Sequence, residues 1–131
     1  MTTMYVGFWL SSDKYNFDFS DLIPCGEIEK NKIGDINKRR GEVINRCNWS
    51  CCTAKKECVY TDDALKDLYE ILKTNFGDIK KRISELNLTV NIYVAVDTTE
   101  KDDVYAIDFS KEMIKMCAEL NADVCVDGIY Y

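Results

Sequence analysis

The stretch that decides the fold runs from Asp62 to Val96 and reads DDALKDLYEILKTNFGDIKKRISELNLTVNIYVAV. In its first part, apolar residues recur every three or four positions, as along one face of a helix. They are Leu65, Leu68, Leu72, Phe76, Ile79, Ile83 and Leu86. From Leu88 onward the apolar period changes to two, which is typical of a strand. We therefore predict a helix from about Asp62 to Asn87, with Thr61 as N-cap and a bend or interruption at Gly77, followed by a strand.

Two further strands and a short helix are predicted upstream of this region. Met4 to Leu10 is apolar or aromatic at both alternating sets of positions, which indicates a strand covered on both faces or nearly so. Glu42 to Cys52 alternates apolar with polar residues, which predicts a half-buried strand. Phe17 to Ile23 is predicted as a short helix stopped by Pro24. No period is clear from Cys25 to Gly41, where we expect an exposed loop.

Downstream, the polar run Asp97 to Asp103 predicts a turn that leads into a strand from Val104 to Phe109, so that the two strands form a hairpin. Ser110 is placed to cap a final helix that runs to about Leu120, and Asn121 suits its C-terminal stop. Residues 122–130 form the last predicted strand. The residues of the final helix expected to face inward are Met113, Ile114, Cys117 and Leu120.

Together these elements predict an α+β fold in one domain spanning residues 1–131. The expected order is β-α-β-α-β-β-α-β. Two longer helices are expected to pack on one face of a mostly antiparallel sheet.

Several of these segments resemble a known family. They are the opening VGFWL (6–10), the loop leading to Asn48-Trp49-Ser50, the long helix, and the ending IDFSKEMIKMCAELNADVCVDGIY (107–130). The sequence is similar over nearly its whole length to the bacterial family called domain of unknown function 4279, although the middle segment, rich in Cys and Lys, departs from it. The resemblance implies a fold and brings no established active site. By analogy of type, small acidic proteins of this kind resemble immunity proteins encoded beside secreted toxins.

Charge and composition exclude several classes of function. The chain of 131 residues has a net charge of −6 and no histidine, so catalysis by a Ser-His-Asp triad or a histidine proton shuttle is excluded. Charge is segregated: residues 30–58 carry eight Lys or Arg against three acids, and residues 97–131 carry nine acids against three lysines. A negative net charge opposes binding to nucleic acids and anionic membranes. A basic protein is a more suitable partner for a chain with this net charge than a nucleic acid or an anionic membrane.

Most of the seven cysteines are interpreted as structural thiols in or near the core. Cys47, Cys51, Cys52 and Cys58 contain no Cys-x-x-Cys pair, and no histidine is present to complete a zinc site. No base of the usual kind is present to activate a nucleophilic thiol. We therefore expect no metal, no cofactor and no catalytic residue. The N-terminus lacks a charged n-region and a long apolar core, so we expect a cytoplasmic protein.

Two charged clusters are candidates for binding. Lys38-Arg39-Arg40, with Arg46, Lys55 and Lys56, would suit RNA if Trp49 were a stacking platform, but Trp49 lies on the apolar side of its strand and is interpreted as a core residue. The acidic turn gives our predicted partner-binding residues: Asp97, Glu100, Asp102 and Asp103. If these are not the contact, the basic region from Lys38 to Arg46 is the next candidate.

The leading hypothesis is a small acidic immunity protein that neutralises a cognate bacterial toxin by direct binding, as a monomer or weak dimer. A regulatory or structural binding domain is the alternative. An enzyme that depends on carboxylates is a third hypothesis.

Overall fold

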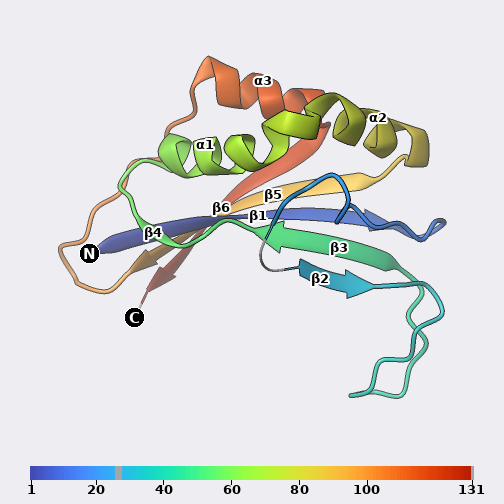
Figure 1. Cartoon of the computed structure of the whole chain (residues 1–131). Coiled ribbons are helices and arrows are strands. Elements are labelled where there is room, and N and C mark those ends of the chain that lie inside the picture. The colour runs from blue at the N-terminus through green and yellow to red at the C-terminus, as the bar shows by residue number, and fades with distance from the viewer. Residues whose placement is uncertain (26–27, 131) are drawn as a thin grey trace.

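The computed structural model describes residues 1–25 and 28–130, the last two as backbone only, and confirms the α+β class. A sheet lies on one side and the helices are stacked on the other (Figure 1). The strands are β1 (Thr2–Ser12), β2 (Ile28–Asn31), β3 (Cys47–Cys52), β4 (Lys56–Glu57), β5 (Thr89–Thr98) and β6 (Ala122–Tyr130). The helices are α1 (Thr61–Leu72), the 3-10 turn η1 (Lys73–Asn75), α2 (Phe76–Leu86) and α3 (Lys111–Glu119). Within the described ranges, no helix is both long and apolar enough to cross a membrane.

The sheet is mostly antiparallel, as predicted, and β1 lies at its centre. The strand order is β2-β3-β1-β5-β6, and β4 pairs with β1 beyond the end of β3. Only the β5–β6 pair is parallel among the described strands, and α3 makes the connection between these two strands. β1 pairs with β5 from Thr2 to Ser11 and with β3 from Gly7 to Ser12, so both of its edges are occupied.

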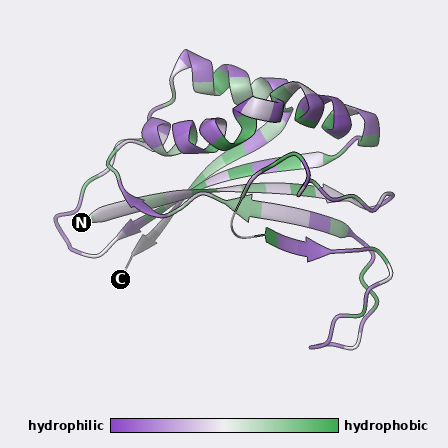
Figure 2. Ribbon diagram, viewed as in Figure 1, coloured by the Kyte–Doolittle hydropathy of each residue, from purple (hydrophilic) through white to green (hydrophobic). Residues whose placement is uncertain are grey.

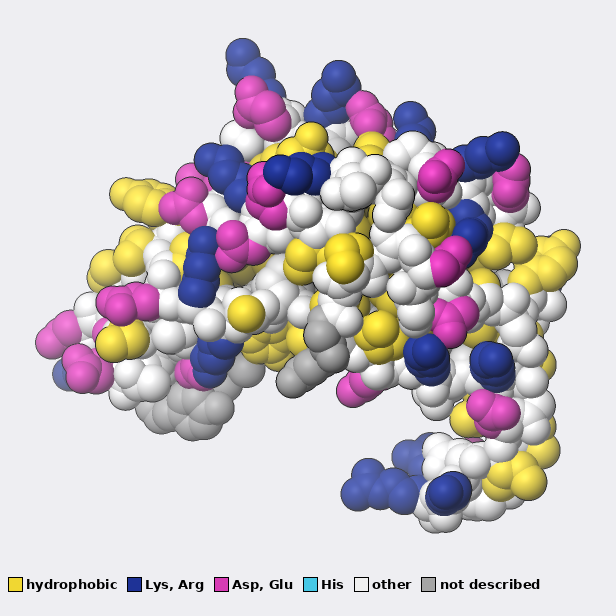
Figure 3. Space-filling model, viewed as in Figure 1, with side chains coloured by type: hydrophobic (Ala, Val, Ile, Leu, Met, Phe, Trp, Pro, Cys, Tyr) yellow, Lys and Arg dark blue, Asp and Glu magenta, His cyan; other side chains and the backbone are white. Residues whose placement is uncertain are grey.

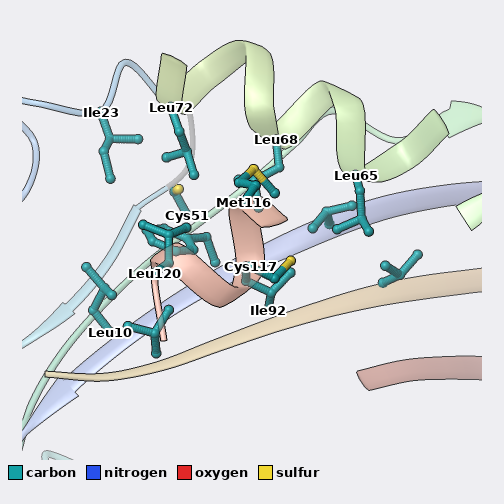
Figure 4. Packing of buried hydrophobic residues seen from close by; sticks show 14 of the residues in the cluster. Leu10, Ile23, Cys51, Leu65, Leu68, Leu72, Ile92, Met116, Cys117 and Leu120 are labelled. Atoms are coloured by element: carbon teal, nitrogen blue, oxygen red, sulfur yellow. The ribbon is translucent and has the colours of Figure 1, made fainter. Parts of the chain in front are cut away.

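The core lies between the helices and one face of the sheet (Figure 4). Alternate residues of β1, such as Met4 and Phe8, and of β5, such as Ile92, point towards the helices and are fully buried. The helices turn their apolar sides to the sheet and their polar sides to solvent (Figure 2). Because a buried leucine or phenylalanine contributes roughly 1.5–3 kcal/mol relative to an exposed one, this layer supplies the main stabilisation. The predicted core residue Trp49 is fully buried here, with its Nε1 donating to Ser20 Oγ at 3.5 Å.

The long helix forms with two differences from the prediction. The interruption expected at Gly77 falls slightly earlier, at η1 (Lys73–Asn75). The N-cap is Tyr60 instead of Thr61. The Thr61 hydroxyl bonds to Asp108 instead of capping the helix. It donates to the Asp108 carbonyl at 2.8 Å and accepts from the Asp108 N–H at 2.9 Å.

The helix predicted at residues 17–23 is wrong. A single turn forms, in which the Leu22 and Ile23 N–H groups both donate to the Phe19 carbonyl. The Asp18 carboxylate accepts from the Ser20 N–H at 2.8 Å. Such a local bond between side chain and backbone competes with helix formation. Phe19 and Ile23 are nonetheless buried in the core, so the segment packs as an ordered loop.

The hairpin predicted after β5 is also wrong. Residues 104–109 form no strand, and only Ala106 makes an isolated parallel bridge, with Tyr60. The Ala106 N–H donates to the Val59 carbonyl at 2.8 Å, so this segment runs beside the start of α1 instead of turning back along β5.

Two short strands, β2 and β4, were not predicted, and the strand expected from Glu42 begins at Cys47. The described order is therefore β-β-β-β-α-α-β-α-β.

The final helix is confirmed at both ends. The Ser110 hydroxyl accepts from the Met113 N–H at 3.3 Å, and Asn121 adopts a left-handed conformation with φ of 53°. Met113, Cys117 and Leu120 are buried as predicted. Ile114, which was also expected to face inward, is 57% exposed.

Replacing Leu120 with Ala should lower the free energy of unfolding by about 2–5 kcal/mol, because it opens a cavity in the core. Ile114→Ala is the matched control from the same region and should change it by about 0.5 kcal/mol or less. Urea denaturation of both variants measures the difference. Equal losses would show that α3 packs differently from this description.

Asp62 joins the start of α1 to the start of α3. Its Oδ1 accepts from the Ser110 N–H at 2.8 Å, and its Oδ2 lies 3.2 Å from the Lys66 ammonium. Burial disfavours ionisation of this carboxyl, but the bonds from Ser110 and Lys66 outweigh burial and hold the pKa of Asp62 below its usual value. The charged form therefore stabilises the folded protein.

Asp62→Asn should lower the free energy of unfolding at neutral pH by about 1–3 kcal/mol. Because the folded-state pKa lies below the unfolded value of about 3.9, this stabilisation is present above that value and is lost as the pH falls through the folded pKa. Unfolding measured from pH 7 down to pH 3 should therefore depend less on pH in the variant than in the wild type. Asp63→Asn, at an exposed neighbouring position, should keep the wild-type dependence, and a wild-type profile in Asp62→Asn would contradict the assignment.

Candidate functional site

The sheet face opposite the helices is the candidate site. Among the described elements, no helix crosses this face (Figure 1). Register places one row of residues side by side across five strands: Glu29, Ser50, Trp9, Asn91 and Asp123. The row has a tryptophan at its centre and an acidic residue on each edge strand. We call the whole surface the open face.

Three aromatic side chains form the centre of the open face. The Tyr93 ring lies between Tyr5 and Trp9, with ring centroids 6.1 Å from each. Gly7 makes this arrangement possible, because a Cβ built on it would lie 2.2 Å from Tyr93 Cε1. The Tyr93 ring therefore rests on bare backbone between its two neighbours.

The open face corrects the expectation that the first strand is covered on both faces. Trp9 is 38% exposed. Tyr5 and Tyr93 are half-buried, and their rings pack edge to face. The two-sided apolar pattern of β1 therefore reflects a core on one side and an aromatic surface on the other.

Acidic side chains surround the aromatic centre. One hollow beside Tyr93 is lined by Trp9, Asn91, Cys125 and Asp127, and a second by Tyr5, Glu29, Cys52 and Lys55. In the part of the chain described, the exposed carboxylates of Glu29, Asp123 and Asp127 form no ion pair. Lys55 is already paired with Asp97, so the exposed, unpaired charge on this face is negative.

The open face also holds a neutral phenol. Burial, and after it the neighbouring Tyr93, raises the pKa of Tyr5 above its usual value of 10.0. Tyr5 therefore stays protonated at neutral pH and adds no charge to the face. The rings and the carboxylates together favour a cation, because aromatic faces carry partial negative charge.

A basic arm, residues 32–46, borders the open face. It links β2 to β3 and extends away from the sheet on the side opposite the helices (Figure 1). Its two sides meet at the isolated Ile36–Val43 bridge, and Gly34 and Gly41 supply the positive φ that its turns need. Lys38, Arg39 and Arg40 are exposed at its end, where basic side chains gather (Figure 3). This confirms the exposed loop expected around them.

The four predicted partner-binding residues do not form one surface. The Asp97 side chain is buried against Lys55, and its Oδ1 has no hydrogen-bond partner among the described groups. Asp103 pairs with the Met1 ammonium and accepts from the Thr99 and Glu100 N–H groups, both at 2.9 Å. Only Glu100 and Asp102 project freely to solvent. Asp103 therefore holds the turn together and Asp97 ties the end of β5 to Lys55, whereas Glu100 and Asp102 remain candidates for contact.

The cysteines are mostly structural in position. Cys47, Cys51, Cys58 and Cys117 are buried, and burial raises the pKa of Cys51 and of Cys117 above the usual thiol value. Cys125 is exposed on the open face. Among the residues described, no three Cys, Asp or Glu side chains gather as a metal site.

The open face was missed by sequence reasoning, although a signal was present. Tyr5, Gly7 and Trp9 occupy alternate positions of one strand, and Tyr93 is the aromatic residue on the polar side of another. A glycine between two aromatics in a strand indicates close approach by another group. This pattern would have singled out the surface had the strand not been assumed to be covered.

Comparison with known proteins bears on the family. A family described as domain of unknown function (DUF4279) matches residues 2–131, which confirms the resemblance seen in the sequence. No curated protein and no solved structure gives a significant match.

Replacing Gly7 with Ala should displace the Tyr93 ring and lower the free energy of unfolding by about 1–3 kcal/mol, as overpacking does. The same change in a Tyr93→Ala background should cost less than about 0.5 kcal/mol, because the clash is gone. Gly77→Ala is the control, since a Cβ there meets no atom within 4 Å and should stabilise α2 by up to about 1 kcal/mol. A loss from Gly7→Ala that is the same with and without Tyr93 would refute the contact.

Proposed function

The chain belongs to the family of domain of unknown function DUF4279, and we propose that it is a binding protein that holds cationic side chains of a partner protein on its open face. One observation carries this proposal. The aromatic centre of Tyr5, Trp9 and Tyr93 is rimmed by carboxylates that form no ion pair within the described residues. A guanidinium or ammonium group placed there meets ring faces and carboxylates at once.

The binding free energy from such contacts is sufficient for recognition. A cation over an aromatic ring contributes about 0.5–2 kcal/mol, depending on how far it is desolvated. A charged hydrogen bond to a carboxylate adds about 1.5–3 kcal/mol. The acidic surface also speeds encounter with a basic partner, in a manner that weakens with salt.

Within this class we propose the narrower role of an immunity protein, which neutralises a cognate bacterial toxin by direct binding. An acidic inhibitor of a basic toxin uses the same complementarity that the open face offers. Two exposed acids of the 97–103 turn, Glu100 and Asp102, form the competing contact surface. A regulatory binding domain would use the same face for a different basic protein.

Variants that remove equal charge from the open face and from the turn show which of the two surfaces makes the contact. Asp123→Asn with Asp127→Asn removes two negative charges from the open face, and Glu100→Gln with Asp102→Asn removes two from the turn. We expect the first pair to weaken binding of a (Gly-Arg)4 peptide about tenfold or more, and the second to change it less than about twofold. Isothermal titration calorimetry at two salt concentrations measures both effects, with a (Gly-Glu)4 peptide as the negative probe.

The aromatic contribution has its own control. Trp9→Ala should also weaken binding of the arginine peptide, whereas Tyr69→Ala on α1 should not, although both side chains are 38% exposed. Equal binding by all four variants would place the contact elsewhere. For the immunity role, co-expression with the toxin encoded beside the gene should protect cells with the wild type and the turn variant, and not with the open-face variant.

A further inference from the structure

The arm and the open face carry opposite charge, and neither is neutralised within the described part of one chain. The arm holds five Lys or Arg against two acids, giving +3. Its tip residues Lys38, Arg39 and Arg40 form no ion pair with a described residue. The open face holds the unpaired acids Glu29, Asp123 and Asp127. The chain therefore contains both halves of a complementary contact.

The arm also exposes apolar surface. Ile36 and Val43 face each other across the arm and are 65% and 68% exposed. These two apolar side chains lie beside the unpaired cations of the arm, so both kinds of group are available to contact a second surface. The open face offers rings for the apolar pair and carboxylates for the cations.

We propose that two copies of the chain pair through their open faces, with the arm of each laid across the open face of the other. The pairing rests on the proposed function, in which the open face binds cationic groups. A second copy of the chain supplies such groups through its arm. Arm and face lie on the same side of the sheet (Figure 1), so a two-fold axis satisfies both contacts with the same residues. Each arm places Arg39 and Arg40 near the Trp9–Tyr93 rings and the edge acids of its partner.

This pairing regulates the site. A cationic partner protein must displace the arm before it reaches the rings, so the dimer is a self-occluded state and the bound form is a one-to-one complex. Two chains of net charge −6 repel each other at long range. The pairing is therefore a weak one that a stronger cationic ligand reverses.

Charge reversal tests the pairing directly. The arm variant carries Lys38→Glu, Arg39→Glu and Arg40→Glu, and the face variant carries Glu29→Lys, Asp123→Lys and Asp127→Lys. In a dimer of either variant alone, like charges face each other at both contacts, which should weaken dimerisation at least tenfold. Mixed in equal amounts, the two variants restore both contacts, because the acidic arm meets a basic face and the basic arm meets an acidic one. Sedimentation equilibrium of the full chain measures the association, and circular dichroism confirms that each variant folds.

A third variant controls for overall charge. Lys80→Glu, Lys101→Glu and Lys111→Glu change the net charge by the same amount as the arm variant, at exposed positions outside the arm. We expect this variant to dimerise within about threefold of the wild type. A wild type that stays monomeric up to about 1 mM would overturn the pairing, as would an arm variant that associates as strongly as this control, or a mixture that fails to associate.

The proposed function can fail independently of the pairing. If the wild type is monomeric and its open face still binds the arginine peptide, the pairing is wrong and the proposed function stands. If the chain dimerises through arm and face but the peptide does not compete, the open face is a self-contact and the cationic partner is wrong. Association that survives in both charge variants would point to another surface, such as the outer edge of β6, and would overturn the pairing.

Discussion

The pairing of β1 with a strand on each side is the constraint on which the rest of the molecule depends. A strand sends alternate side chains to opposite faces, so this single segment supplies both the centre of the core and the centre of the open face. Phe8 is fully buried beneath the helices, while its neighbour Trp9 is exposed on the other side. A shift of one residue in register would exchange the two sets. Folding and the candidate site are thus fixed by the same hydrogen-bond ladder.

Periodic segments could be predicted from the sequence because their local pattern and their tertiary role agree. β5 and α3 are examples: the strand alternates between exposed and buried residues from Thr89 to Ile92, and Ser110 and Asn121 mark the limits of the helix. Residues 17–23 and 104–109 could not be predicted, because their conformation depends on bonds to distant groups. Ala106, for instance, is held by Val59, and nothing in the residues around Ala106 indicates this partner.

The candidate site was harder to predict, for a different reason. Whether an apolar strand face is covered depends on which side the helices pack, and no local pattern of β1 decides this. The acidic turn was chosen for its charge and for its expected place at the tip of a hairpin, yet Asp97 and Asp103 are paired with Lys55 and the Met1 ammonium. Charge density in a sequence therefore identifies groups that are available for binding only after the ion pairs within the fold are known.

The contact between Gly7 and the Tyr93 ring links two positions that lie far apart in the chain and face each other across β1 and β5. A side chain at the first position excludes a large ring at the second, so neither residue is free to change alone. We expect the two positions to covary among members of the family, with a small residue at one wherever an aromatic ring stands at the other. Such a pair would trace which relatives keep the aromatic surface and which have replaced it by a different one.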